Sequence, residues 1–141
     1  MNRMILAAAT AVVLSACQTM GWTESVHLGG GLTGAQEVPA VASAGSGTLE
    51  ATYNKETRKL SYTVNYSGLS GPATMAHFHG PAAPGSNAPV VVPFANPANP
   101  ISGEATLTEA QAIDLLAGRW YVNVHTAAHP GGEIRAQVTT R

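Results

Sequence analysis

The feature that most constrains the fold of this chain is a series of short segments in which apolar and polar residues alternate, separated by clusters of glycine, proline, asparagine and serine. In residues 59–67, Leu60, Tyr62 and Val64 fall on one face of an extended chain and polar residues fall on the other. Because successive side chains of a strand point to opposite faces, this pattern predicts a strand with one buried face. Eight such segments follow one another, one beginning near Val26 and the others at residues 47–54, 59–67, 74–80, 90–94, 103–107, 120–126 and 133–140.

So many short strands in one small domain predict an all-β fold, an antiparallel Greek-key β-sandwich of immunoglobulin-like or superoxide-dismutase-like type. The segments at 47–54 and 59–67 should form a hairpin, and prolines on both sides of residues 90–92 restrict that segment to a sheet edge. One segment has helical periodicity instead. Thr108 and Gln111 form a capping-box pattern and Gly118 fits a C-terminal cap, so we expect one short helix near 108–117 that covers an end of the sandwich.

The N-terminal residues are typical of an export signal. Arg3 precedes an apolar run from Met4 to Leu14, which is shorter than the about 20 residues needed to span a bilayer but fits the core of a signal peptide. Residues 14–17 resemble the lipobox of bacterial lipoproteins, which implies cleavage before Cys17 and attachment of lipid to it; an ordinary signal peptide is the alternative. We therefore expect a lipoprotein signal peptide at residues 1–16, the lipidated Cys17 with a tether at 17–25, and one domain at 26–141.

Composition excludes several classes of function. Cys17 is the one cysteine of the chain, so its lipidation would leave no thiol for a disulfide or for a metal site with cysteine ligands. The net charge is −1 and the basic residues do not cluster, so we expect no nucleic-acid partner. We expect a cell-envelope protein anchored by lipid on the periplasmic or outer-membrane face, with the membrane as one partner and an envelope protein as a candidate second partner.

Histidines point to a candidate metal site. His77 and His79 are two positions apart on a predicted strand, so their side chains share a face about 7 Å apart and can converge on one ion. His125, on a later strand, and His129, on the loop after it, are candidate third and fourth ligands. Met75 shares the face of His77 and is either a soft copper ligand or, as we expect, a core residue. The alternative is that the histidines are solvated or are hydrogen-bonded structural groups.

The C-terminal hairpin supplies candidate residues around these ligands. Residues 129–132, His-Pro-Gly-Gly, should form its turn, and one extra residue at Gly131 or Gly132 would bring the apolar residues of both strands to the same face. Metal-bound histidines usually donate their second N–H to a carboxylate or carbonyl, and Glu133 is the candidate acceptor; a surface ion pair with Arg135 is the alternative. The polar face of the hairpin should gather Asn123, His125, Glu133, Arg135 and Gln137.

Four motifs, in order, resemble the CHRD family of chordin-like domains: LTGAQEVP at residues 32–39, AHFHGPA at 76–82, YVNVHT at 121–126 and PGGEIRAQ at 130–137. The resemblance covers nearly the whole predicted domain, although Ala136 stands where the family usually has glycine. It implies an immunoglobulin-like β-sandwich and an extracytoplasmic role, as in bacterial lipoprotein members. The histidine spacing also resembles, more weakly, the copper site of Cu/Zn superoxide dismutases, without the zinc-loop residues of that family.

These observations leave two main hypotheses. The first is an extracytoplasmic, lipid-anchored CHRD protein that binds a transition metal through His77, His79, His125 and His129. Imidazole ligands and the Irving–Williams order favour copper as the cofactor, with zinc as the alternative. The second is a metal-free module that binds another envelope protein. A copper-only, dismutase-like redox enzyme is a third hypothesis, but the sequence assigns no catalytic residue and favours a binding role over an enzyme.

The lipobox leads to a test of the anchor. Replacing the acylated thiol in Cys17→Ser should move the protein from the membrane fraction to the soluble periplasm, or block its processing. Cell fractionation followed by immunoblotting measures this. If the variant partitions as the parent does, Cys17 does not carry the anchor.

Overall fold

The computed structural model describes residues 24–141, and the predicted signal peptide and Cys17 lie outside the described residues. None of the helices in residues 24–141 has the length and apolar character needed to cross a membrane. The elements are β1 (Ser25–Thr33), the 3-10 helix η1 (Gly34–Gln36), β2 (Ser46–Asn54), β3 (Lys59–Ser67), β4 (Ala73–His79), β5 (Val90–Pro93), β6 (Ile101–Thr106), α1 (Glu109–Leu116), β7 (Tyr121–Thr126), β8 (Ile134–Gln137) and β9 (Thr139–Thr140).

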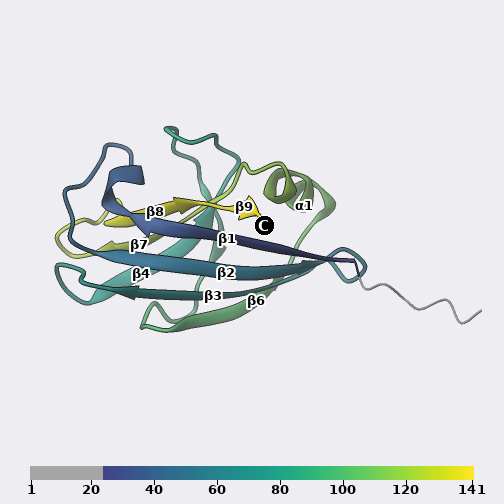
Figure 1. The fold of residues 1–141 in the computed structure, drawn as a ribbon, viewed down its shortest axis with the longest axis horizontal. Helices are drawn as coiled ribbons and strands as arrows, with labels where there is room; N and C mark the ends of the chain where they lie inside the picture. Colours follow the sequence, from purple (N-terminus) through teal and green to yellow (C-terminus); the bar gives the residue numbers. More distant parts are fainter. Residues whose placement is uncertain (1–23) are drawn as a thin grey trace, which may run out of the picture.

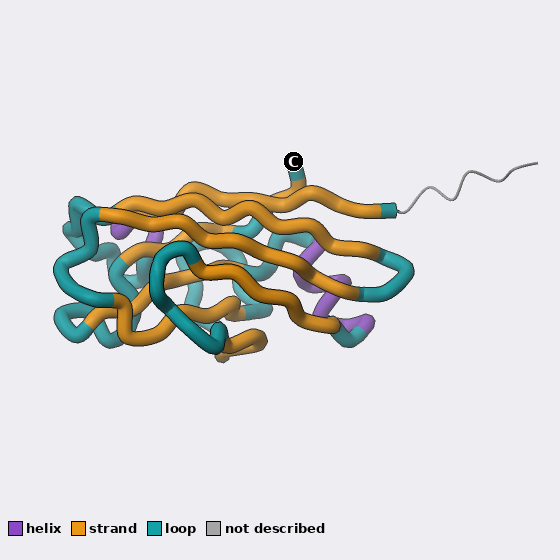
Figure 2. The backbone as a smooth tube through the Cα atoms, turned by 90° about the horizontal axis from the view of Figure 1, so that it is seen from below, coloured by secondary structure: helices purple, strands orange, loops and turns teal. Residues whose placement is uncertain are grey.

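The strands form one antiparallel sheet that folds over into two layers, which confirms the predicted all-β fold (Figure 1). Their order is β5-β4-β7-β8-β1-β2-β3-β6, with β9 pairing to β1. The strands run along the length of the molecule and most loops gather at their ends (Figure 2). As predicted, β2 and β3 form a hairpin and β5 lies at an edge of the sheet.

The last predicted strand is interrupted. Residues 134–137 pair with β7, residues 139–140 pair with β1, and the N–H of Val138 between them donates instead to Trp120 O at 2.9 Å. At the break the pairing changes, because β8 pairs with β7 and, at Arg135, with β1, whereas β9 pairs with β1. The prediction of a continuous strand over 133–140 is therefore wrong, because one segment serves two sheet partners.

The core lies between the layers and contains the predicted apolar faces. Tyr62 of β3 stacks on Phe94 at a centroid distance of 4.6 Å and meets the edge of Phe78, from β4, at 5.1 Å. These rings join one layer to the other, and a fully buried large apolar side chain stabilises a fold by about 1.5–3 kcal/mol. The apolar residues of β7 and β8 also face inward in register, Val122 opposite Ala136 and Val124 opposite Ile134.

The predicted helix is present as α1, at one end of the layers (Figure 1). The Thr108 hydroxyl accepts from Gln111 N at 3.1 Å, and the Gln111 side chain accepts from Thr108 N at 2.9 Å, so the capping box is confirmed. Gly118 follows the helix with a φ of +73°, a conformation that favours glycine. Leu115 packs the helix into the core.

The outer face of strand β7 is not solvated. All six residues of β7 are buried, including the alternate residues Tyr121, Asn123 and His125 that point away from the core. Two loops lie over this face of β7 and are held there by hydrogen bonds. The loop after β4 approaches Tyr121 through Ala88, and Asn87 of the same loop donates to Val38 O, in the loop after β1, at 3.0 Å. The molecule therefore has a second, polar interior between β4, β7, β8 and these loops.

Candidate metal centre

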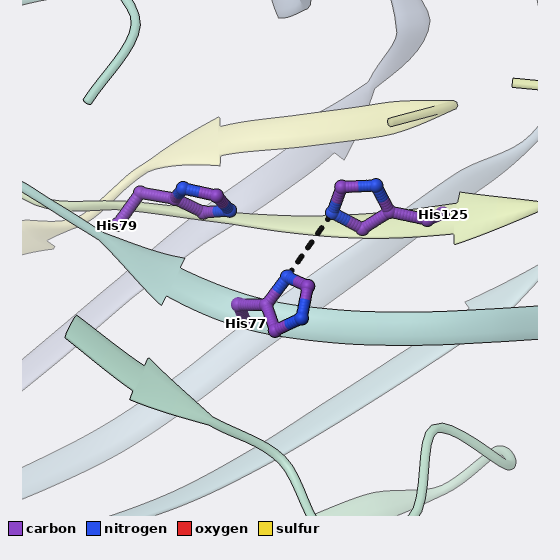
Figure 3. A group of neighbouring side chains, drawn as sticks. All are labelled: His77, His79 and His125. Carbon is purple, nitrogen blue, oxygen red and sulfur yellow. Dashed lines mark hydrogen bonds between the residues drawn. The ribbon is translucent and has the colours of Figure 1, made fainter. Parts of the chain in front are cut away.

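Three of the predicted ligands meet in this polar interior. His77 and His79 lie on β4 and His125 lies on the neighbouring strand β7, where its Cα is paired with that of Met75. One nitrogen atom of each ring lies within 4.8 Å of the others, and Figure 3 shows the three rings turned toward one another. Three atoms so arranged lie within about 2.8 Å of a common point, against a metal–nitrogen bond of about 2.0–2.1 Å. Small side-chain rotations would bring the three nitrogen atoms within bonding distance of one ion.

His79 has one satisfied and one unsatisfied ring nitrogen. Its Nδ1 donates to Ala88 O at 2.9 Å, which fixes the tautomer and leaves Nε2 with a lone pair. That Nε2 is buried and has no hydrogen-bond partner within the described residues. The ring is held in place because it stacks on Tyr121 at a centroid distance of 4.7 Å and an angle of 3°.

His125 faces more acceptors than a neutral ring can serve. Its Nδ1 lies 2.9 Å from Pro130 O, and its Nε2 lies 2.9 Å from Asn123 Oδ1. A neutral imidazole has one N–H, so one of these contacts lacks a hydrogen unless positive charge is added. If Nδ1 donates to Pro130, the Nε2 side of the ring is open to a cation.

His77 completes the cluster from the more exposed side. Its Nδ1 lies 3.2 Å from His125 Nε2, and its ring meets that of His79 edge to face at 5.4 Å. In the metal-free state His77 Nδ1–H can donate to His125. Binding of an ion at both nitrogens requires His77 to carry its hydrogen on Nε2 instead, which changes the tautomer and not the charge.

The surroundings favour neutral rings, the form that binds metals. Burial, together with the positive charges that His125 and His79 would carry, lowers the pKa of His77 to about 4. Burial also lowers the pKa of His79, against the opposing effects of the Ala88 carbonyl and of the Asn123 side chain.

The buried Arg135 holds this interior together. Its guanidinium donates to Asn87 Oδ1 at 3.0 Å and to Ser86 O at 2.7 Å, and it lies 3.4 Å from the centre of the Tyr121 ring. Since Tyr121 in turn stacks on His79, one cation, one phenol and one imidazole form a continuous stack. The alternative considered for Glu133, a surface ion pair with Arg135, is wrong, because both side chains are buried and have other partners.

Glu133 and His129 are not brought to the cluster. The fully buried Glu133 carboxylate accepts from Ser70 N at 2.9 Å and from the hydroxyls of Ser70, Thr126 (2.9 Å) and Ser43 (3.0 Å). Burial opposes its charge, but these donors hold its pKa below the usual range. His129 Nε2 lies 3.9 Å from Glu133. The expected contact from Glu133 to a cluster histidine is therefore not made; for His125, the backbone carbonyl of Pro130 takes that place.

Met75 is not the core residue that the sequence suggested. Its side chain is 47% exposed, on the same face of β4 as His77. Val90, the β5 partner of His79, is 45% exposed, so two of the three exposed large apolar residues in the described part adjoin the cluster.

Sequence reasoning did not single out Glu37. This residue follows η1, is 6% exposed, and its Oε1 is the other buried side-chain atom in residues 24–141 that has no hydrogen-bond partner. Glu37 belongs to the LTGAQEVP motif, but nothing in the spacing of that motif indicates that Glu37 packs beside β7, almost 90 residues later.

A comparison with known protein families identifies the domain. The model of the CHRD domain family matches residues 29–138. The chain belongs to the CHRD family. The cluster histidines, Glu37 and Arg135 all lie within the matched CHRD domain. Searches of curated proteins and of solved structures found no match.

The approach of Glu37 to the hairpin of the CHRD domain can be tested at a glycine. Gly132 has a φ of +124°, and a Cβ there would collide with Glu37 Oε1, whereas a Cβ on Gly131 meets nothing within 4 Å. Gly132→Ala should therefore lower the free energy of unfolding by about 2–4 kcal/mol, and the control Gly131→Ala by less than about 0.5 kcal/mol. Urea unfolding measures both. Equal effects would show that the hairpin does not require glycine at 132.

Proposed function

We propose that this CHRD protein is an extracytoplasmic, lipid-anchored protein that binds one transition-metal ion through His77, His79 and His125, with copper preferred over zinc. Its role is to store, deliver or use that ion at the cell envelope. The observation that carries the proposal is the buried Nε2 of His79, which has no partner among the described residues and faces two other imidazoles.

The unpartnered nitrogen is costly without a ligand. Leaving a buried hydrogen-bonding group unsatisfied costs about 1–3 kcal/mol, and native proteins seldom keep such groups. Here the cost falls on a lone pair that the hydrogen bond from Nδ1 to Ala88 orients. A metal ion at the centre of the three rings would satisfy it, and also the excess of acceptors around His125.

The set of ligand atoms supports copper. Three neutral imidazole nitrogens suit copper, zinc, nickel and iron, and among divalent ions Cu(II) binds such ligands most tightly. The group has no carboxylate, the kind of ligand that magnesium and calcium require. A predicted fourth imidazole, His129, is absent from the group, which leaves a coordination position for Met75, for water or for a partner protein.

The proposal predicts which histidines control copper binding. With full chain prepared free of metal in detergent, His79→Ala and His125→Ala should each weaken Cu(II) binding at least tenfold, because each removes one ligand. His27→Ala is the control, since His27 lies on the exposed face of the other layer near Thr52. Competition with a calibrated chelator measures the dissociation constants.

Thermal unfolding gives an independent measurement of the same event. Copper at 100 times its dissociation constant should stabilise the parent by about 2.7 kcal/mol, and zinc should do so less at the same concentration. If copper does not raise the unfolding midpoint, or raises it equally in His79→Ala and the parent, the histidines are structural. The protein-interaction hypothesis would then be favoured.

The exposed thioether of Met75 leads to a prediction about the binding of Cu(I). A thioether is a soft ligand that selects Cu(I), and Met75 is exposed beside His125 and His77. Met75→Leu, which keeps the apolar bulk and removes the sulfur, should weaken Cu(I) binding at least tenfold and leave Zn(II) binding within about twofold. Equal Cu(I) affinity in parent and variant would exclude Met75 as a ligand.

A further inference from the structure

The Glu37 carboxyl is buried beside Asn123, a residue that contacts His125 of the candidate metal centre. Its Oε1 has no hydrogen-bond partner in the described part of the chain. The side chain adjoins the Asn123 amide, because a Cβ on Gly132 would touch both Glu37 Oε1 and Asn123 Nδ2. A buried carboxyl with so few partners favours its protonated form.

The charged groups that face Glu37 are few. Arg135 on β8 is the cation that acts on it, but the guanidinium donates its hydrogen bonds to Asn87 and Ser86, and no bond from it to Glu37 is formed. On β7 the group that faces Glu37 is the neutral Asn123 amide. Burial raises the pKa of Glu37 to about 7, although the Asn123 amide and the charge of Arg135 oppose the shift.

Asn123 connects this carboxyl to the histidines. Its Oδ1 lies 2.9 Å from His125 Nε2, the nitrogen that faces His77, while its Nδ2 lies on the side of Glu37. One amide group thus separates Glu37 from a ligand nitrogen. In a buried site of low effective dielectric constant, a divalent cation at that nitrogen would act strongly on a carboxyl that lies one amide group away.

A path to solvent also exists. A pocket of about 250 Å³ lies between the loop after β1 and the loop after β4, and it is lined by Gln36, Glu37, Pro84 and Arg135, among others. No cluster histidine lines this pocket, which gives a proton that leaves Glu37 a route apart from the ligands.

We propose that Glu37 releases its proton when a metal ion enters the histidine cluster, so that a buried carboxylate compensates the charge of the ion. This inference rests on the proposed metal binding. Metal–nitrogen bonds form, the O–H bond of Glu37 breaks, the proton passes to the solvent, and no electron is transferred. Glu37 is a positioning residue that acts through Asn123. Its titration adds a pH dependence to the metal affinity, beyond the pH dependence caused by protonation of the ligands themselves.

The test counts protons released on metal binding. Full chain in detergent is titrated with Zn(II) and, separately, Cu(II) by calorimetry in two non-coordinating buffers of different ionisation enthalpy. One unit below its pKa a carboxyl is nine-tenths protonated, so at pH 6 the parent should release about 0.9 proton more than Glu37→Gln. At pH 8 the difference should fall to about 0.1 or less. Glu50→Gln, on the exposed outer face of β2, is the matched control and should release as many protons as the parent.

Difference infrared spectroscopy of the parent keeps the proposal testable if Glu37→Gln does not fold. At pH 6 the C=O band of a protonated buried carboxylic acid should be present without metal and disappear when metal binds. Equal proton release by parent and Glu37→Gln, or a band that persists, overturns the inference while metal binding stands. Absence of any metal binding overturns the proposed function, and this inference with it.

Discussion

The guanidinium of Arg135 is the interaction on which the polar interior depends. It is 1% exposed, and removing such a charge from water is costly unless hydrogen bonds and aromatic contacts compensate. Asn87 and Ser86 provide the hydrogen bonds, and the Tyr121 ring provides a cation–π contact. Because both hydrogen-bond partners belong to the loop after β4, the same contacts hold that loop over the outer face of β7. A lysine could not replace it, since an ammonium lacks the planar fork that serves two acceptors and stacks on a ring.

Covering this face changes the chemistry of the histidines. On an open sheet, His77 and His79 would be solvated and would titrate near their ordinary pKa. Under the loop, burial lowers the pKa of His77 and His79, and His79 is fixed between Ala88 and Tyr121. The two buried side-chain atoms without partners in residues 24–141, on His79 and Glu37, both lie in this interior. A base and an acid left unsatisfied around the same cluster fit a site that a cation completes.

The part of the site that sequence reasoning reached is the part set by local geometry. The spacing of His77 and His79 guarantees a shared face, and the apolar pattern of β7 and β8 placed His125 on the opposite face from the core. Glu133 was expected to contact a cluster histidine because it follows the same turn, but its carboxylate turns to donors from Ser70 and Thr126. Separation along the sequence does not indicate which loop crosses which face of the sheet. For that reason no sequence pattern pointed to Glu37 in the way that the histidine spacing pointed to His77 and His79.

The elements follow from local sequence patterns: alternating side chains require strands with one buried face, the capping box begins the helix, and the CHRD motifs follow in order. What lies on the other face of those strands depends on how the chain folds in three dimensions. The strand order brings β4 beside β7, and loops far apart in the chain bury Tyr121, Asn123 and His125 on the side that the pattern would leave wet. The physical reason is that periodicity encodes the direction of each side chain, whereas burial of a polar face depends on the hydrogen bonds that a covering loop can complete.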